Sequence, residues 1–157
     1  MATPRSAVLP SIAEKEHYSR WFSITQDQID LFAALTGDKQ WIHQLNAKCS
    51  GSPFNAPIAH GLLLVSFAIS LARESGALED ATWILYGFDK LRFRAPVKVG
   101  TRIRCRTTIL GVRELFDRTL LNARFVMEIE DHTIPAFVAD CLLLNLGPDS
   151  ELKGRVT

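Results

Sequence analysis

The sequence predicts an α+β protein in which an antiparallel sheet wraps around one central buried helix, and two observations carry this prediction. First, an apolar run from Gly61 to Ala72 has almost no polar side, which is typical of a buried helix. Second, the hydrophobic pattern then changes to a period of two over four segments joined by short turns. Strands with short connections pair antiparallel, and the preceding helix is the element available to cover their apolar face.

The chain begins with a segment of little regularity and continues into a well-marked helix. Residues 1–13 contain two prolines and no clear periodicity, so we expect a flexible N-terminal arm ahead of a single domain over residues 14–157. Residues 17–23 are expected to form a short strand. Residues 25–28, TQDQ, read as a capping box, and a helical stripe of apolar residues follows as far as Gly37, a residue suited to end a helix.

The rest of the chain contains a loop, the apolar helix and the strands. Residues 44–57 are rich in Asn, Ser, Gly and Pro and are expected to form a loop with room for one helical turn. The apolar helix starts at Gly61 and is expected to stop at Gly76. The strands are expected over residues 82–93, with an interruption at Gly87, and over residues 102–109, 121–130 and 136–146.

The composition limits the classes of partner and compartment. The 157 residues are 47% hydrophobic and 22% charged, with a net charge of +1, so neither nucleic acid nor a membrane is expected as a partner. The longest apolar run is shorter than the about 20 residues of a membrane-spanning helix, and no secretory signal is visible. Three cysteines without a C-x-x-C pair fit a reducing compartment, so we expect a cytoplasmic protein.

A carboxylate, an imidazole and a helix start lie close together in the sequence, between residues 36 and 61. Asp38 and His43 are five residues apart, in a segment too short and polar to be a core element. Seventeen residues after His43, the sequence Ile-Ala-His-Gly opens the apolar helix at Gly61, where the first backbone amides are free to bind. Taken singly, Asp38 is a typical turn residue and His43 a typical structural histidine. Together with Gly61 they predict an acid–base site with an oxyanion hole.

Metal and serine chemistry fit the sequence less well. Asp38, His43, Cys49 and His60 could bind zinc in principle, but they do not have the spacing of a closed zinc site, so no metal is expected. The two serines inside the apolar helix lack the nucleophile-elbow pattern of a serine hydrolase.

Four ordered blocks of the sequence form a recognisable set, namely FAALTGDKQWIH at residues 32–43, PIAHG at 57–61, YGFDKLRF at 86–93 and APVKVG at 95–100. Together they resemble the MaoC-like hydratases, and in particular the branch named after nodulation protein N. The resemblance runs from about residue 23 to the last predicted strand. It implies the hotdog fold, an antiparallel sheet around a central helix, and a homodimer.

The same resemblance implies the reaction and the residues that perform it. Members of the family hydrate trans-2-enoyl-CoA reversibly to the (R)-3-hydroxyacyl-CoA, without a metal or an organic cofactor. The catalytic pair of the family matches Asp38 and His43, and the glycine whose amide faces the thioester oxygen matches Gly61. The residues implied to bind the acyl-CoA substrate are Ile58, Ala59, His60, Gly61, Tyr86 and Gly87.

The residue types suit this chemistry, although the sequence leaves open which member of the pair is the acid and which the base. An aspartate and a histidine that hold one water can deprotonate it as it attacks C3 and deliver a proton to C2 on the same face. Two positions depart from the nodulation protein N pattern, Leu45 and Leu85, and leave room for a non-catalytic acyl-CoA-binding hotdog protein. A hotdog thioesterase is a weaker alternative, because residues 61–73 contain no acidic side chain.

Two sets of basic residues are candidates to contact the phosphates of CoA. Arg102, Arg104 and Arg106 alternate along one predicted strand, and the plainer interpretation of them is a solvated strand face. Lys90, Arg92 and Arg94 are the competing set.

Overall fold

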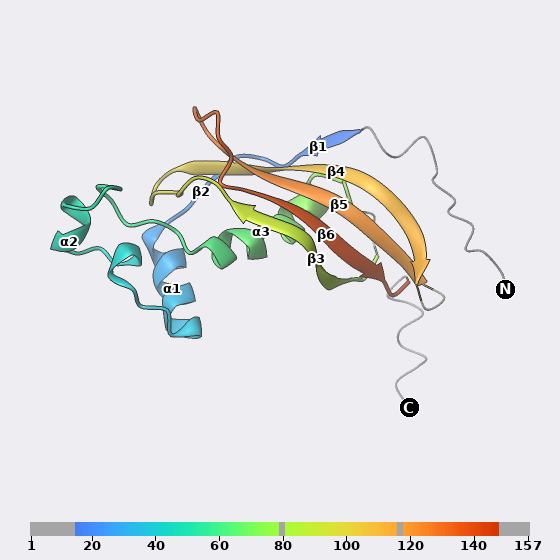
Figure 1. The fold of residues 1–157 in the computed structure, drawn as a ribbon, viewed down its shortest axis with the longest axis horizontal. Coiled ribbons are helices and arrows are strands. Elements are labelled where there is room, and N and C mark those ends of the chain that lie inside the picture. The colour runs from blue at the N-terminus through green and yellow to red at the C-terminus, as the bar shows by residue number, and fades with distance from the viewer. Residues whose placement is uncertain (1–14, 79–80, 116–117, 148–157) are drawn as a thin grey trace.

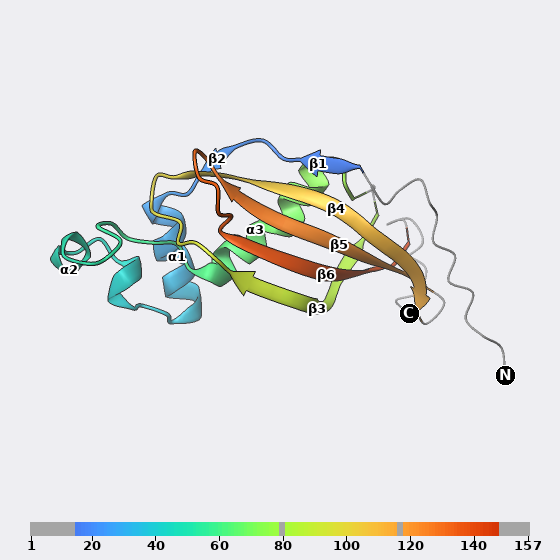
Figure 2. The ribbon, with the colours of Figure 1, turned by 45° about the horizontal axis from the view of Figure 1, so that its top comes forward.

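The computed structural model describes residues 15–78, 81–115 and 118–147, and these form an antiparallel sheet that arches over a central helix (Figures 1 and 2). The described strands are β1 (Glu16–Tyr18), β2 (Phe22–Ser23), β3 (Trp83–Phe93), β4 (Arg102–Leu115), β5 (Arg118–Ile129) and β6 (Phe137–Asn145). The described helices are α1 (Gln26–Thr36), the 3₁₀ turn η1 (Trp41–His43), α2 (Ala47–Ser50) and α3 (Gly61–Glu74). The predicted α+β arrangement is confirmed. The predicted arm at residues 1–13 lies outside the described residues.

The sheet order is β1-β4-β5-β6-β3, and β2 pairs with β4 beside β1. The four long strands fall where the period-two pattern predicts them, although β4 and β5 run further than expected. The strand predicted over residues 17–23 is instead divided into β1 and β2. At the division, the Ser19 hydroxyl accepts a hydrogen bond from the Cys105 amide at 2.9 Å, so a side chain replaces the backbone acceptor there.

Helix α3 packs against β4 and β5 and is buried on one side only. Its buried residues are Leu63, Leu64, Val65, Ala68, Leu71 and Ala72. Leu62 is 61% exposed, and Ser66 and Ser70 are exposed as well, so the prediction of a helix buried all round is wrong for this side. The reason is geometric, because a single curved sheet can cover only the side of a helix that faces it. None of the helices in the described part of the chain has the length and hydropathy needed to span a membrane.

Helix α1 has the predicted ends, and they place Asp38. The hydroxyl of Thr25 accepts from the amide of Gln28, and the side chain of Gln28 accepts from the amide of Thr25, which completes the capping box. Gly37 ends the helix with φ of 79°, a left-handed conformation, and its amide donates to the carbonyl of Ala33. Asp38 therefore follows directly after a firmly defined helix end.

Strand β3 forms one edge of the sheet, since β6 is the only described strand that pairs with it (Figure 2). Its register against β6 shifts twice, between Leu85 and Gly87 and between Phe88 and Lys90, which confirms the predicted interruption at Gly87. Three neighbouring large residues of this edge are about half exposed, namely Ile84, Leu85 and Tyr86.

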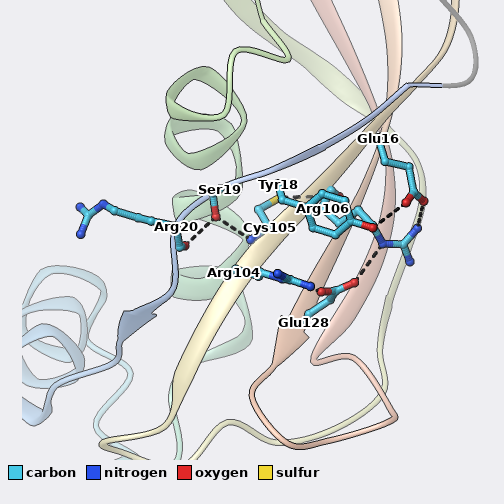
Figure 3. A network of polar contacts seen from close by, with 8 residues as sticks. All are labelled: Glu16, Tyr18, Ser19, Arg20, Arg104, Cys105, Arg106 and Glu128. Carbon is cyan, nitrogen blue, oxygen red and sulfur yellow. Dashed lines mark hydrogen bonds and ion pairs between the residues drawn. The ribbon is translucent and has the colours of Figure 1, made fainter.

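The arginine stripe of β4 lies on a partly exposed face of the sheet and forms ion pairs, which neither interpretation of the sequence included (Figure 3). Arg104 and Arg106 each bind one oxygen of Glu128, at 2.8 and 2.9 Å, and Arg106 also binds Glu16 of β1. The guanidinium of Arg104 also lies over the ring of Tyr18, with 4.6 Å to the centroid. The contacts of Glu16 and Tyr18 attach β1 to the sheet, and since the ion pairs are partly exposed, each is expected to contribute little to stability.

Candidate active site

The segment between α1 and α3 lies beyond one end of the sheet and brings the predicted site residues to the start of α3 (Figure 1). Two sets of contacts fix this segment. The side-chain amide of Gln26 in α1 donates to the carbonyl of His43 at 3.0 Å. Residues 57–59 pair with residues 97–99, through an isolated bridge between Ile58 and Lys98 and two flanking backbone hydrogen bonds of 2.8 and 2.9 Å.

Asp38 directs one carboxylate oxygen to the site and uses the other for local contacts. Its Oδ1 accepts from the side-chain amide of Gln40 at 3.0 Å and from the Gln40 backbone amide at 3.4 Å. The hydrogen bond from the Gln40 side chain holds the pKa of the Asp38 carboxyl below its usual value. The group is therefore ionised at neutral pH, and Oδ2 faces Nε2 of His43 at 3.9 Å.

His43 is buried, and its tautomer is fixed by the backbone. Its Nδ1 lies 2.7 Å from the carbonyl oxygen of Ile58, which can only accept, so Nδ1 carries the proton. The other ring nitrogen, Nε2, is then unprotonated, and it faces Asp38. Burial lowers the pKa of His43, more strongly than the contacts with Ile58 and Asp38 raise it, so the ring is neutral at neutral pH.

His60 lies directly against this pair. Its ring stacks on the ring of His43, with 3.6 Å between centroids and 24° between planes. Its Nε2 lies 2.9 Å from the backbone carbonyl oxygen of Asp38, to which it donates. The structure thus brings Asp38, His43 and His60 into one cluster, although His60 is 22 residues away from Asp38 in the chain.

Gly61 is the first residue of α3 and lines a groove of about 480 Å³. The first backbone bond of the helix runs from the Leu64 amide to the His60 carbonyl, and no described residue accepts from the amides of Gly61 and Leu62. The ring of Phe93 lies against the Cα of Gly61, so that a Cβ there would be 2.7 Å from the ring. The groove is lined by His43, Phe54, Ile58, Ala59, Gly61, Leu62, Leu64, Phe93, Arg94, Ala95, Pro96 and Val97.

Most of the predicted residues meet here, but not all. His43, Ile58, Ala59 and Gly61 line the groove, and Asp38 and His60 contact His43 from outside it. Tyr86 and Gly87 lie on the edge strand β3 and do not line the groove of this chain. Their predicted role in substrate binding stays a prediction.

Sequence reasoning did not single out Phe93 or residues 95–97 as site residues, although it named Arg94 as a candidate contact for the CoA phosphates. Phe93 and Arg94 line the groove together with residues 95–97. The block APVKVG contained a usable signal, because its proline and valines mark an extended segment. Its pairing with residues 57–59 is a long-range contact that spacing in the sequence does not reveal.

Asp38, His43 and His60 also form a group whose potential ligand atoms all lie within 4.8 Å of one another, as a metal site would require. The stacking of the two imidazoles opposes this use. A metal binds in the plane of an imidazole ring at about 2.0–2.1 Å from the nitrogen, and two nearly parallel rings have no point in common at that distance.

We therefore expect that removal of divalent metals leaves the activity unchanged. Dialysis against EDTA, followed by addition of Zn²⁺ or Mg²⁺, should change the rate of substrate turnover by less than the error of the assay. Loss of turnover after dialysis and its recovery with one of the metals would assign these three side chains a metal-binding role instead.

The fold is that of hotdog hydratases. The solved (R)-hydratase from A. caviae involved in PHA biosynthesis aligns with a TM-score of 0.71 at 21% identity, over 83% of this chain and 94% of that one. Among curated relatives, 3-hydroxyacyl-thioester dehydratase Z of Mycobacterium tuberculosis is 35% identical over 132 residues, covering 83% of this chain and 87% of the relative. Nodulation protein N of Rhizobium leguminosarum bv. viciae is 33% identical over 155 residues, covering 94% of this chain and 96% of the relative.

The family model described as MaoC like domain matches residues 8–128. The chain belongs to the MaoC-like dehydratase family. The predicted hotdog fold, the predicted family and the predicted class of enzyme, a hydro-lyase, are thereby confirmed.

Proposed function

We propose that the protein is an (R)-specific hydratase that adds water to trans-2-enoyl-CoA and, in reverse, dehydrates the 3-hydroxyacyl-CoA. One observation carries the proposal: an ionised carboxylate oxygen of Asp38 and a neutral imidazole nitrogen of His43 lie 3.9 Å apart beside a groove that ends on free helix amides. The names of two kinds of relative support the substrate class, since one is a 3-hydroxyacyl-thioester dehydratase and another an (R)-specific enoyl-CoA hydratase.

The pair suits the activation of water. At 3.9 Å, Asp38 Oδ2 and His43 Nε2 are too far apart for a direct hydrogen bond, but both can accept from the same water molecule. The lone pairs of that water are then free to attack C3 of the enoyl group. One proton of the water passes to the pair as the C–O bond forms, and the pair returns a proton to C2.

The start of α3 suits the negative charge that develops during this step. As C3 is attacked, electrons move to the thioester oxygen and an enolate forms. The unbonded amide of Gly61 and the positive end of the helix dipole lie where they can stabilise this oxygen. The close contact with Phe93 leaves no room for a side chain at position 61, so only glycine lets the helix start keep this position beside the ring.

The decisive experiment is a turnover assay on the purified protein. We expect the absorbance of the enoyl-thioester band to fall with crotonyl-CoA or with a longer enoyl-CoA, and chiral chromatography to identify the product as the (R)-3-hydroxyacyl thioester. Saturable acyl-CoA binding without turnover would instead establish the non-catalytic binding protein. Release of free CoA thiol would establish the thioesterase.

Arg94 supports CoA as the carrier, because among the described residues that line the groove it is the one permanent cation. The groove lining contains no carboxylate, and no described residue pairs with the Arg94 guanidinium. Of the competing residues, Arg92 donates to the carbonyl of Leu91 and Lys90 lies beside Asp140, outside the groove. Arg102, Arg104 and Arg106 are occupied by ion pairs.

We expect Arg94→Gln to raise KM for crotonyl-CoA by about tenfold, the loss of roughly one charge-assisted hydrogen bond. KM for the crotonyl thioester of N-acetylcysteamine, which has no phosphate, should not change. Arg92→Gln is the matched control and should leave both values as they are. An equal rise of KM for both thioesters in Arg94→Gln would show that Arg94 contacts the acyl part rather than a phosphate.

We also propose a homodimer in which β3 of one copy lies beside β3 of the other. The unpaired edge of β3 exposes backbone groups and the apolar side chains of Ile84, Leu85 and Tyr86, and antiparallel pairing across a two-fold axis would cover them.

Light scattering on a sizing column should therefore give a mass of twice 17.5 kDa. Tyr86→Lys should shift the mass towards the monomer, because it places two like charges close together across the axis. Leu35→Lys, at a leucine of α1 that is 85% exposed, is the control and should remain dimeric. A dimer that tolerates Tyr86→Lys but not Leu35→Lys would place the interface on α1.

A further inference from the structure

His60 has more contacts with the catalytic pair than the proposed reaction requires of it. It precedes α3 as its N-cap residue and is 3% exposed. Phe32 of α1 lies on the ring with 5.0 Å between centroids, and His43 stacks on it at 3.6 Å. The imidazole is therefore enclosed between the helix that ends before Asp38 and the ring of His43.

The hydrogen bond of His60 acts on the backbone of Asp38. Because the Asp38 carbonyl can only accept, Nε2 of His60 carries the proton and donates to it at 2.9 Å. The side chain of Asp38 is 40% exposed, and its hydrogen bonds in the structure come from Gln40, two residues further on. The bond from His60 is thus a long-range contact that fixes the backbone from which the Asp38 side chain extends.

The stack acts on the orientation of His43. The single ring hydrogen bond of His43, from Nδ1 to the Ile58 carbonyl, leaves the ring free to tilt about that bond. A second ring held parallel at 3.6 Å prevents this tilt and keeps Nε2 directed at Asp38. One side chain therefore constrains both members of the pair.

The remaining nitrogen of His60 shows that the imidazole does not merely fill space. With the proton on Nε2, the Nδ1 atom of His60 is an unprotonated acceptor. It is buried without a hydrogen-bond partner among the described residues. A buried unpaired acceptor is destabilising, and an apolar ring of similar size would avoid it. The presence of a histidine despite this unpaired Nδ1 is explained if the site needs the hydrogen bond that Nε2 donates to Asp38.

We propose that His60 is a positioning residue that sets the distance between Asp38 and His43 by bonding the backbone of one and stacking on the ring of the other. The inference rests on the proposed function of that pair. It differs from a role in substrate binding, since His60 stacks on the ring of His43 but does not itself line the groove. It also differs from proton transfer, since its only proton is committed to a carbonyl.

Three substitutions separate the two contacts. His60→Ala removes both, and we expect kcat for crotonyl-CoA to fall by about 10²-fold with little change in KM, the effect of a misplacement of about 1 Å. His60→Gln retains a donor near the position of Nε2, and His60→Phe retains the stacked ring. Each should recover part of kcat. A rise of KM with unchanged kcat would overturn the proposal in favour of substrate binding.

A double-mutant cycle distinguishes positioning from a purely structural role. His60→Phe keeps the stack on His43 and loses only the hydrogen bond to Asp38, so in the Asp38→Asn background we expect it to cause no further loss of kcat, because the carboxylate to be positioned is already absent. If His60→Phe reduces kcat by the same factor in both backgrounds, the residue only supports the fold and the proposal is wrong.

A measurement without substrate keeps the test independent of the proposed reaction. Nitrogen-15 spectra of the histidine rings should show His43 as the Nδ1–H tautomer and His60 as the Nε2–H tautomer in the wild-type protein. In His60→Ala the signals of His43 should shift and broaden, because the ring loses its stacking partner and can tilt, although the Ile58 carbonyl still holds its tautomer. Unchanged His43 signals in a folded variant would overturn the proposal, whether or not the protein hydrates enoyl-CoA.

Discussion

Replacing Asp38 by asparagine is expected to reduce kcat for crotonyl-CoA hydration by about 10²- to 10⁴-fold, the range over which positioned acid–base groups act. The change is isosteric, and Oδ1 can still accept from Gln40, so the turn after α1 should persist. Only the charge that faces His43 is lost. Since Asp38 and His43 would hold one water together, His43→Ala should cause a loss of the same order, and the two substitutions combined should cost little more than either alone.

A matched variant of His43 separates chemistry from folding. His43→Ala leaves the Ile58 carbonyl without its donor and removes the stack on His60, so it should also lower the thermal midpoint. In His43→Asn the side-chain amide can still donate to Ile58 while the nitrogen facing Asp38 is gone. We expect it to be more stable than His43→Ala and equally inactive. Substantial turnover by His43→Asn or Asp38→Asn would reject the pair as the catalytic groups.

Gly61→Ala is expected to lower kcat/KM for crotonyl-CoA by about 10²–10³-fold, the cost of losing one oxyanion-hole donor. A methyl group at position 61 would lie 2.7 Å from the Phe93 ring, so the ring or the helix start must move. Alanine suits the first turn of a helix better than glycine, so folding should be preserved. The loss would thus come from the displaced amide and from a ring pushed into the groove.

A second substitution tests this account of Gly61. Phe93 is half exposed, and Phe93→Ala should make room for the methyl group without a large loss of stability. In the Gly61→Ala background, Phe93→Ala should therefore restore part of kcat/KM, whereas alone it should mainly weaken acyl binding. If Gly61→Ala is as active as wild type, the amide at position 61 is not the oxyanion donor.

The features predicted correctly from the sequence are those fixed by near neighbours. The capping box at Thr25 and the left-handed Gly37 are decided within a few residues, and they are sufficient to place Asp38 directly after a helix. The period-two pattern located the long strands for the same reason, because the side that each residue faces depends only on its place in the strand.

The features that could not be predicted depend on contacts between distant segments. The groove is built where residues 57–59 pair with residues 97–99, and the stack of His43 on His60 likewise joins residues far apart in the chain. The exposed side of α3 depends on how far the sheet curves, which no local pattern encodes. Leu45, a departure from the family pattern, is 78% exposed and does not line the groove of this chain.

The backbone and the side chain of Ile58 have separate roles in the site. Its carbonyl fixes the proton of His43, while its side chain forms part of the groove wall. Every amino acid supplies the same backbone carbonyl, so a new side chain at position 58 would reshape the groove without altering the tautomer of His43. Substrate preference could therefore change in related proteins through the side chain at position 58, while the hydrogen bond that orients His43 stays the same.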